Sequence, residues 1–222
     1  VRSKEVAREV LAGLRAIPRQ EPLPNYDDAG VDVPGEFLVR PDLFGRMVSR
    51  KDDRAFDLYL YLLKEQSDRH IPPGSPFSVN HHTLAVALGI DQSSQESFRR
   101  QINRLLAKLQ NLYGLIRVQT EFKGDSTVLF TDLPPGRSAH LPARYWTFGW
   151  DRRLSFAEKG FLLVSQFESA VSSRRPRWSV AQKTLARRYG GSPWFFSEGA
   201  TGLRRQNLLE VELAPFTNGP AP

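Results

Sequence analysis

The chain has 222 residues, of which 40% are hydrophobic and 25% are charged. This balance supplies enough apolar side chains for a packed core and excludes a wholly disordered chain. Lys and Arg number 31 against 24 Asp and Glu, so the formal net charge is +7 and a polyanionic partner is worth considering, while the absence of Cys excludes disulfides, Cys-based zinc sites and thiol nucleophiles.

The first 35 residues are expected to lie outside the main folded domains. Between Lys4 and Ile17, apolar residues recur at helical spacing, which predicts an amphipathic helix. Several Pro and Gly residues between Pro18 and Gly35 break regular structure, so we predict a linker or a strap on the surface there. The opening helix would then be an arm that packs on its own domain or on a second subunit.

The first domain, predicted over residues 36–133, contains a long helix followed by a break. Asp52 or Asp53 can cap a helix that runs to about Ser67 and carries a broad apolar face. The segment 70–76 contains three Pro and one Gly, so the helix must end before it.

A short strand and a second helix are predicted next. Residues 77–79 are expected to be extended, and Asn80 can cap a helix that runs through Leu88. Gly89 then supplies the positive φ that a tight turn between two helices requires.

The third predicted helix of this domain has an apolar face and a polar face. It begins near Ser93, because Ser93 and Glu96 fit a capping box. Its apolar positions follow helical spacing and are Phe98, Ile102, Leu105 and Leu109. Two strands at 115–122 and 126–132, joined by a turn at 123–125, complete the domain as a hairpin.

The order of elements begins again after Pro134, Pro135 and Gly136, in a second domain predicted over residues 145–214. The predicted elements are a connector at 137–144, strands at 145–150, 178–180 and 208–213, and helices that start at Ser155, Ala181 and Ser192. Three short segments of the first domain match segments of the second at an offset of about a hundred residues, which favours a tandem fold.

Each half resembles the winged helix-turn-helix domain of bacterial transcription regulators and of plasmid and phage replication initiators. The resemblance is carried by Ser-Val, Thr-Leu-Ala, Gly-Ile and Phe-Arg-Arg-Gln-Ile within 78–116, and by Trp-Ser-Val-Ala-Gln-Lys-Thr-Leu-Ala-Arg-Arg-Tyr-Gly-Gly-Ser at 178–192. Two such domains in one chain are similar to replication initiators of the Rep type. The resemblance implies a mainly α fold with small β-hairpins, in the α+β class, built as two tandem winged helix-turn-helix domains.

In such a fold the third helix enters the major groove, where Arg reads guanine and Asn reads adenine through paired hydrogen bonds. The polar face of the third helix, its N-terminus and the hairpin tip are therefore the expected DNA contacts. These residues are Ser94, Gln95, Arg99, Arg100, Asn103, Arg104 and Lys123. The alternative is that the same residues form an ordinary solvated helix face.

The second domain has basic residues that are expected to neutralise phosphates without reading sequence. They are Arg174, Arg175, Arg177, Lys183, Arg187, Arg188, Arg204 and Arg205. An ordinary charged surface is the alternative. The helix from Ser192 departs from a polar recognition helix, because it carries three aromatic residues and two Gly residues. Trp194, Phe195 and Phe196 are expected in the core, with a protein-binding patch or base stacking as alternatives.

No catalytic motif stands out, and we expect no enzymatic activity, no cofactor and no metal site. His81 and His82 are adjacent, so on a helix they point in different directions, and a structural or phosphate-contact role fits them better than a metal. No apolar run reaches the roughly 18 residues needed to cross a bilayer, and no signal-peptide pattern is present. We therefore expect a cytoplasmic protein, associated with a plasmid or the nucleoid, and not with a membrane.

These features lead to three functional hypotheses. The first is a plasmid-type replication initiator that binds double-stranded DNA at repeated origin sites and dimerises through the N-terminal helix or one winged helix. The second is a transcriptional repressor of the same architecture, because a shared fold does not fix the site that is bound. The third is a module that binds proteins through its winged helices.

Overall fold

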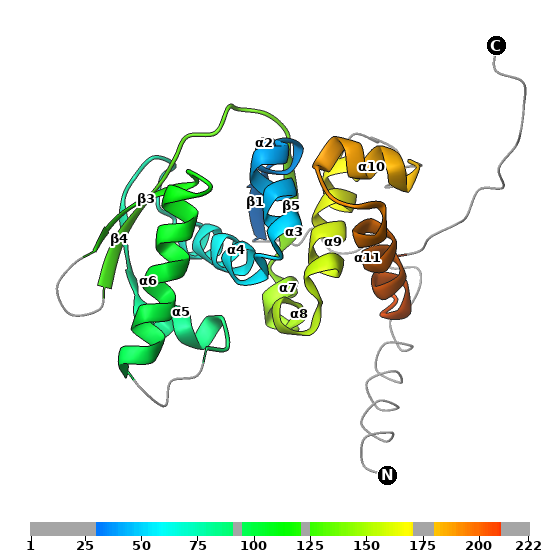
Figure 1. Ribbon diagram of the computed structural model, residues 1–222. Coiled ribbons are helices and arrows are strands. Elements are labelled where there is room, and N and C mark those ends of the chain that lie inside the picture. The colour runs from blue at the N-terminus through cyan, green and yellow to red at the C-terminus, as the bar shows by residue number, and fades with distance from the viewer. Residues whose placement is uncertain (1–29, 91–94, 121–124, 171–179, 210–222) are drawn as a thin grey trace, which may run out of the picture.

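The structure is a computed structural model that describes residues 30–90, 95–120, 125–170 and 180–209 (Figure 1). Helices dominate it, together with two small antiparallel sheets, which confirms the expected mainly α, α+β class. The predicted N-terminal helix from Lys4 to Ile17 lies outside the described residues.

The helices fall into two groups along the chain. The first group comprises α2 (Gly35–Val39), the π-helical turn η1 (Pro41–Gly45), α3 (Arg46–Arg50), α4 (Asp53–Asp68), α5 (His81–Ala87) and α6 (Gln95–Asn111). The second group comprises α7 (Arg144–Thr147), α8 (Trp150–Arg153), α9 (Phe156–Ser169), α10 (Gln182–Tyr189) and α11 (Pro193–Arg205). The strands are β1 (Gly30–Pro34), β2 (Phe77–Asn80), β3 (Ile116–Thr120), β4 (Asp125–Phe130) and β5 (Ser138–Pro142).

The predicted short strand and hairpin form one antiparallel sheet in the order β2-β4-β3. Val128 of β4 is opposite Phe77 of β2 and Val118 of β3 in the register. The helices of this half also form where the sequence predicts them, and α6 buries Phe98, Ile102 and Leu109. Its fourth fully buried position is Leu106 rather than the predicted Leu105, which is only partly buried and lies at the margin of the core.

The predictions of a linker or surface strap at 18–35 and of a connector at 137–144 are wrong in part. Each segment contains a strand, and the two strands pair with each other. Strand β1 lies antiparallel to β5 and directs Val31 and Val33 into the core. Ala139 and Leu141 do the same from β5. Alternating apolar and polar residues in both segments are the strand signal, whereas the neighbouring prolines suggested a loop.

The predicted strand at 145–150 is also wrong, since this aromatic segment forms α7 and the start of α8. Gly149 adopts a left-handed backbone with φ 68°, which ends the first short helix and begins the second. Leu208 and Leu209 are not in a strand either, and residues 178–179 and 210–213 lie outside the described residues. The described part of the second half therefore consists of helices after β5, without the predicted strands.

The two glycines of α11 allow this helix to pack closely on α9. A Cβ atom at Gly199 would lie 2.3 Å from the carbonyl oxygen of Ala157, and one at Gly202 would lie 2.2 Å from the Glu158 carboxylate. Glu158 is held there by a capping box with Ser155, the residue at which the sequence predicts the start of this helix. The helix is therefore continuous through both glycines, because close interhelical packing offsets their low helix propensity.

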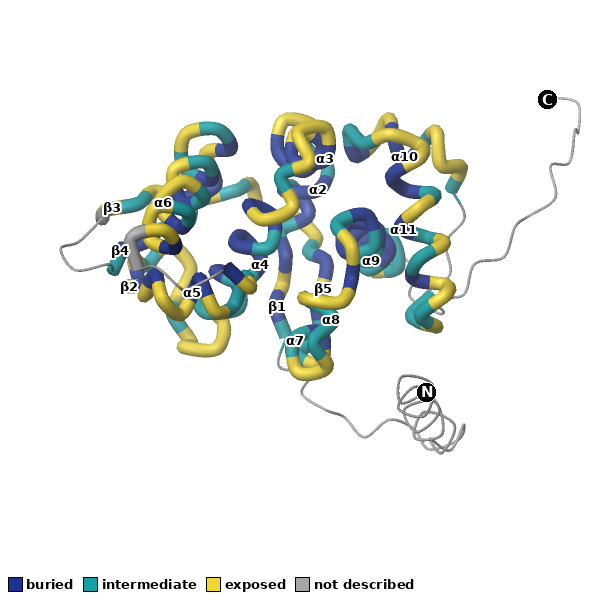
Figure 2. Tube along the Cα trace, turned by 60° about the horizontal axis from the view of Figure 1, so that its bottom comes forward, coloured by how far each residue is buried: buried dark blue, intermediate teal, exposed yellow. Residues whose placement is uncertain are grey.

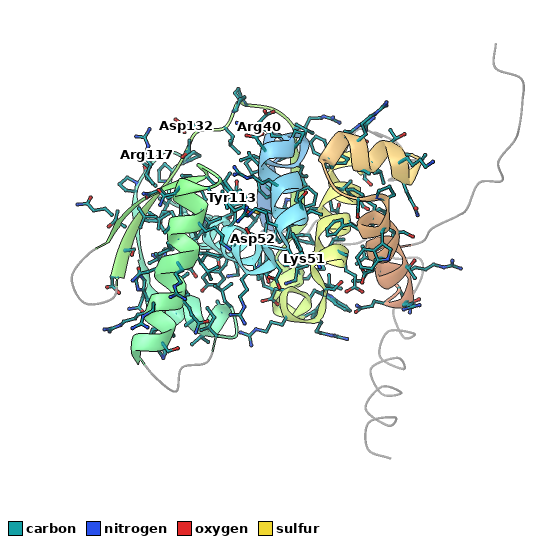
Figure 3. The ribbon with its side chains drawn as sticks, viewed as in Figure 1. Arg40, Lys51, Asp52, Tyr113, Arg117 and Asp132 are labelled. Atoms are coloured by element: carbon teal, nitrogen blue, oxygen red, sulfur yellow. The ribbon has the colours of Figure 1, made fainter. Side chains whose placement is uncertain are left out.

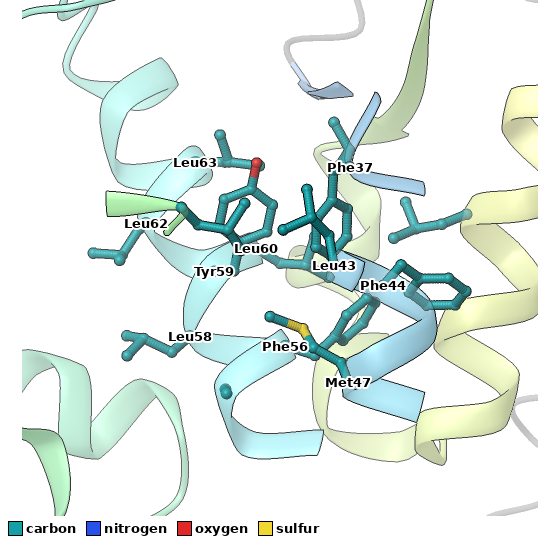
Figure 4. Packing of buried hydrophobic residues seen from close by; sticks show 14 of the residues in the cluster. Phe37, Leu43, Phe44, Met47, Phe56, Leu58, Tyr59, Leu60, Leu62 and Leu63 are labelled. Carbon is teal, nitrogen blue, oxygen red and sulfur yellow. The ribbon is translucent and has the colours of Figure 1, made fainter. Parts of the chain in front are cut away.

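Helix α4 lies at the centre of the molecule, with the β2-β4-β3 sheet and α6 on one side and α9 to α11 on the other (Figures 1 and 2). Seven of its residues are buried, among them Phe56 and Tyr59, which pack with aromatic residues of α2 and η1 (Figure 4). The ring of Phe56 also lies 5.1 Å from that of Phe156 on α9. The core is thus one contiguous cluster to which both halves contribute.

A buried ion pair joins α4 to α9. The ammonium of Lys159 lies 2.6 and 2.7 Å from the two carboxylate oxygens of Asp57, and the Lys159 side chain is only 7% exposed. Burial raises the pKa of Asp57 although the Lys159 ammonium opposes this shift. A charge so deeply buried requires its partner, so the pair fixes how the two halves meet.

We predict that Asp57→Asn lowers the free energy of unfolding by about 3 kcal/mol, because it leaves the Lys159 ammonium buried without a counter-charge. The double variant Asp57→Asn/Lys159→Met should be more stable than the single variant, since it removes the orphaned charge. Urea denaturation at pH 7 measures both. Equal stability of Asp57→Asn and the wild type would contradict the structural role of the pair.

Gly199→Ala should lower the free energy of unfolding by about 1–3 kcal/mol, because the added methyl group has no space against α9. On an exposed helix the same change would stabilise the protein by about 1 kcal/mol, so the sign alone tests the packing. Thr201→Ala, at an exposed position of α11, is the control and should leave stability nearly unchanged. Thermal unfolding followed by circular dichroism measures the difference.

Candidate nucleic-acid interface

The polar face of α6 is exposed along its length. Its described residues are those that the sequence predicts for this face, namely Arg99, Arg100, Asn103 and Arg104. The buried face of α6 holds them outward, because Phe98, Ile102 and Leu109 are almost completely covered. Gln95 is the first residue of the helix, while Ser94 and Lys123 lie outside the described residues.

The helix before α6 is fixed by its cap and its end. The Asn80 side chain accepts hydrogen bonds from the backbone N–H groups of His82 and Thr83, at 2.9 and 3.1 Å. The left-handed Gly89, with φ 61°, ends α5, and the N–H of Ile90 bonds back to the carbonyl oxygen of Ala85. These features confirm the predicted cap and turn, and they set the direction in which the chain leaves α5.

A cluster centred on Asp52 attaches the C-terminal part of α6 to the start of α4 (Figure 3). The Lys108 ammonium lies 2.7 Å from one carboxylate oxygen of Asp52, and the Tyr113 hydroxyl donates to the other. Burial of this carboxyl opposes ionisation, yet the hydrogen bonds from Lys108 and Tyr113 outweigh it and lower the pKa of Asp52. Burial and the Asp52 carboxylate both raise the pKa of Tyr113.

The sequence predicts that Asp52 or Asp53 caps α4. Asp52 does occupy the N-cap position, but its side chain makes no capping hydrogen bond. The carboxylate instead bridges to residues more than fifty positions away, which local sequence patterns cannot reveal. The partners of Asp52 were therefore missed.

Basic residues next to this cluster were also missed. Arg46, Arg50, Lys51 and Arg54 are all exposed, between the start of α3 and the start of α4. The Arg54 guanidinium lies 3.2 Å from the amide oxygen of Gln101 on α6. The available signal was their density, since four of nine consecutive residues are basic.

His81 and His82 have different environments. His81 is buried, and its Nε2 lies 2.8 Å from the Ser126 hydroxyl on β4. His82 is exposed, and its ring meets the edge of Phe98 at 5.8 Å. Within the described ranges, no group of three His, Asp or Glu side chains is arranged to hold a metal ion.

The basic residues that the sequence predicts as phosphate contacts in the second half lie far from α6. Those that the structure describes are exposed and comprise Lys183, Arg187, Arg188, Arg204 and Arg205. They belong to α10 and α11, at the opposite end of the molecule (Figures 1 and 2). Arg188 is engaged in an ion pair with Glu168. Arg174, Arg175 and Arg177 lie outside the described residues.

The three aromatic residues that begin α11 have separate environments. Phe195 and Phe196 are buried as predicted, and their rings lie 5.4 Å apart. Trp194 is 70% exposed, so its expected place in the core is wrong. Helical spacing explains the difference, because Phe195, Phe196 and Leu203 share the face that packs on the core while Trp194 points away from it.

No protein-family model, curated protein or solved structure matches this chain. In the part of the chain that the structure describes, no helix is long and apolar enough to cross a membrane. The α6 surface is therefore a candidate functional site because of the residues that the fold brings together there.

The burial of His81 predicts a pH dependence of stability. Burial lowers the pKa of His81, so the folded state keeps this imidazole neutral while the unfolded chain binds a proton below pH of about 6.5. The unfolded state then binds more protons, and His81 lowers the free energy of unfolding as the pH falls from 7.5 to 5.5.

His81→Gln, which keeps a group able to bond Ser126, should weaken this pH dependence. Urea denaturation of both proteins at pH 7.5 and 5.5 measures it, and the difference between them isolates His81 from the carboxylates that titrate in both. The same loss of stability in the variant and the wild type would show that His81 is not the responsible group.

Proposed function

We propose that this protein binds double-stranded DNA by placing α6 in the major groove. The observation that carries the proposal is the exposed face of α6, which presents three Arg side chains and one Asn side chain opposite a fully buried stripe. A helix of this kind fits the width of the major groove. The net charge of +7 favours the approach to a polyanion.

The surroundings of α6 support this role. The order α4, β2, α5, α6, β3, β4 and the sheet order β2-β4-β3 are those of a winged helix. In that arrangement α5 positions the recognition helix, and the hairpin of β3 and β4 lies beside it as the wing. Lys123, which lies between β3 and β4 in the sequence and outside the described residues, is proposed to contact the DNA backbone.

We propose that the residues of α6 make different kinds of contact with the DNA. Arg99, Arg100 and Asn103 are assigned to base edges, since Arg and Asn make the paired hydrogen bonds that distinguish guanine and adenine. Arg104, nearer the C-terminal end, is assigned to base or phosphate contacts. The exposed Lys183 and Arg187 of α10 are assigned to phosphates at the other end of the molecule.

A biological setting follows from the resemblance of the first half to replication initiators. We propose that the protein recognises repeated sites at an origin, with α10 and α11 extending the contact along the DNA or pairing with a second copy. A repressor would use the same α6 surface at an operator. The two settings are distinguished by selecting bound sites from random duplexes and then locating these sites in the genome.

Arg100→Ala should weaken binding to the selected site by about 1–3 kcal/mol and weaken binding to random duplex much less. Arg137→Ala is the matched control, because it removes an exposed Arg that stacks on Phe167 at a distance from α6. Fluorescence anisotropy with labelled duplexes of both kinds measures the affinities. An equal loss on both duplexes would make Arg100 a phosphate contact only.

A salt titration tests the proposal as a whole. Binding to duplex should weaken linearly with the logarithm of salt concentration, with a slope of several units, because each phosphate contact releases about 0.9 counterions. Absence of duplex binding at low salt by the folded protein would overturn the proposal.

A further inference from the structure

The exposed basic residues between α3 and α4 form a second charged surface beside α6. We name this surface the α3–α4 corner and define it by Arg46, Arg50, Lys51 and Arg54. Arg46 and Arg50 lie one helical turn apart on α3, while Met47 and Val48 between them are buried. The buried pair therefore turns the basic side chains of α3 toward solvent.

Three side-chain contacts join the region of the α3–α4 corner to α6 and to the residue that follows it. Arg54 reaches Gln101 at 3.2 Å, and the Arg46 guanidinium donates to the carbonyl oxygen of Leu112 at 3.0 Å, just beyond the end of α6. Asp52 and Lys108 form a third link. The corner thus follows the C-terminal half of α6 as one connected surface.

The edge of α6 that faces the corner is continuous with its polar face. Gln101, Arg104 and Lys108 lie three and four residues apart, so they share one side of the helix. Arg104 therefore lies between Gln101, which Arg54 contacts, and Lys108, which binds Asp52. Exposed basic side chains are therefore present on both sides of this edge, Arg104 on α6 and Arg54 at the start of α4.

The balance of charge in the corner is positive. Two carboxylates are present, Asp52 and Asp53, against four basic residues of the corner and Lys108. Asp52 is only 10% exposed and is bound to Lys108 and Tyr113, and the Arg50 guanidinium lies 3.7 Å from its carboxylate in a further ion pair. Asp53 accepts the backbone N–H of Arg54 at 2.8 Å. Arg46 and Arg54 donate hydrogen bonds to uncharged oxygens of Leu112 and Gln101, and the charge of Arg46 also acts on the Asp42 carboxylate.

The backbone holds one of these side chains in an uncommon geometry. Lys51 has φ 55° and ψ 42°, the left-handed region that favours glycine. Its N–H bonds to the carbonyl oxygen of Val48, and the N–H of Asp52 bonds to that of Met47, at 3.1 and 3.0 Å. These bonds terminate α3 and keep Lys51 on the exposed side of the turn.

We infer that the α3–α4 corner binds the backbone phosphates of the same duplex that α6 reads. The inference rests on the proposed function and adds four residues that it does not assign. Arg and Lys contacts of this kind position a protein on DNA and do not distinguish sequences. The Asp52 cluster is the positioning element, because it fixes the distance between the corner and α6.

The test compares two double variants of the full chain. Arg50→Ala/Lys51→Gly removes two charges, and glycine suits the left-handed backbone at position 51, so the variant should fold. Arg50→Lys/Lys51→Arg is the matched control that retains both charges. Circular dichroism and thermal unfolding check the fold, and anisotropy titrations at 50 to 200 mM salt, on selected and random duplexes, give the slopes.

The charge-removing variant should lower the salt slope by about 1.8, since each phosphate contact contributes about 0.9. Its affinity should fall by the same factor on both duplexes, whereas Arg100→Ala should act mainly on the selected one. The charge-retaining variant should keep the wild-type slope. As a remote control, Arg137→Ala should also keep it, which separates local contacts from net charge.

An unchanged slope in Arg50→Ala/Lys51→Gly, with normal wild-type binding and a normal effect of Arg100→Ala, would overturn this inference and leave the proposed function standing. A loss confined to the selected duplex would also overturn it, because the corner would then read bases. If the folded wild type binds neither duplex, the proposed function and this inference fail together.

Discussion

The burial of α4 on opposite sides is the constraint on which the rest of the structure depends. One side supports the sheet and α6, and the other meets α9, so a charged residue in the middle of the helix requires a partner. Asp57 is such a residue, and Lys159 of α9 neutralises it. This pair makes the contact between the two halves specific, because any other alignment would leave a charge unpaired inside the core.

The candidate DNA surface depends on α4 through a second carboxylate. Asp52 stands at the start of α4 and collects Lys108 and Tyr113 from α6 and the segment after it. The buried stripe of α6 determines which face of this helix is exposed, and Asp52 determines how its C-terminal half lies against α3. The exposed arginines are thus positioned by side chains that are themselves buried or partly buried.

The helices α6 and α11 differ in what they expose and in how they pack. In the first half, α6 keeps a polar outer face and packs beside a sheet. In the second half, α11 begins with aromatic residues and uses Gly199 and Gly202 to approach α9 closely. The close contact strengthens the core and leaves Trp194 as the large exposed side chain at the start of the helix. The second half meets α4 through α9, at the Asp57–Lys159 pair and the rings of Phe56 and Phe156.

The sequence alone determined the longer helices, the caps of α5 and α9 and the exposed face of α6, because these features depend on spacing within a few residues. Asn80, Ser155 and the stripe from Phe98 to Leu109 are of this kind. Only the tertiary structure decided the pairing of β1 with β5 and the partners of Asp52 and Asp57. Those contacts join segments from fifty to more than a hundred residues apart, and local propensity carries no information about which distant segment will supply the partner.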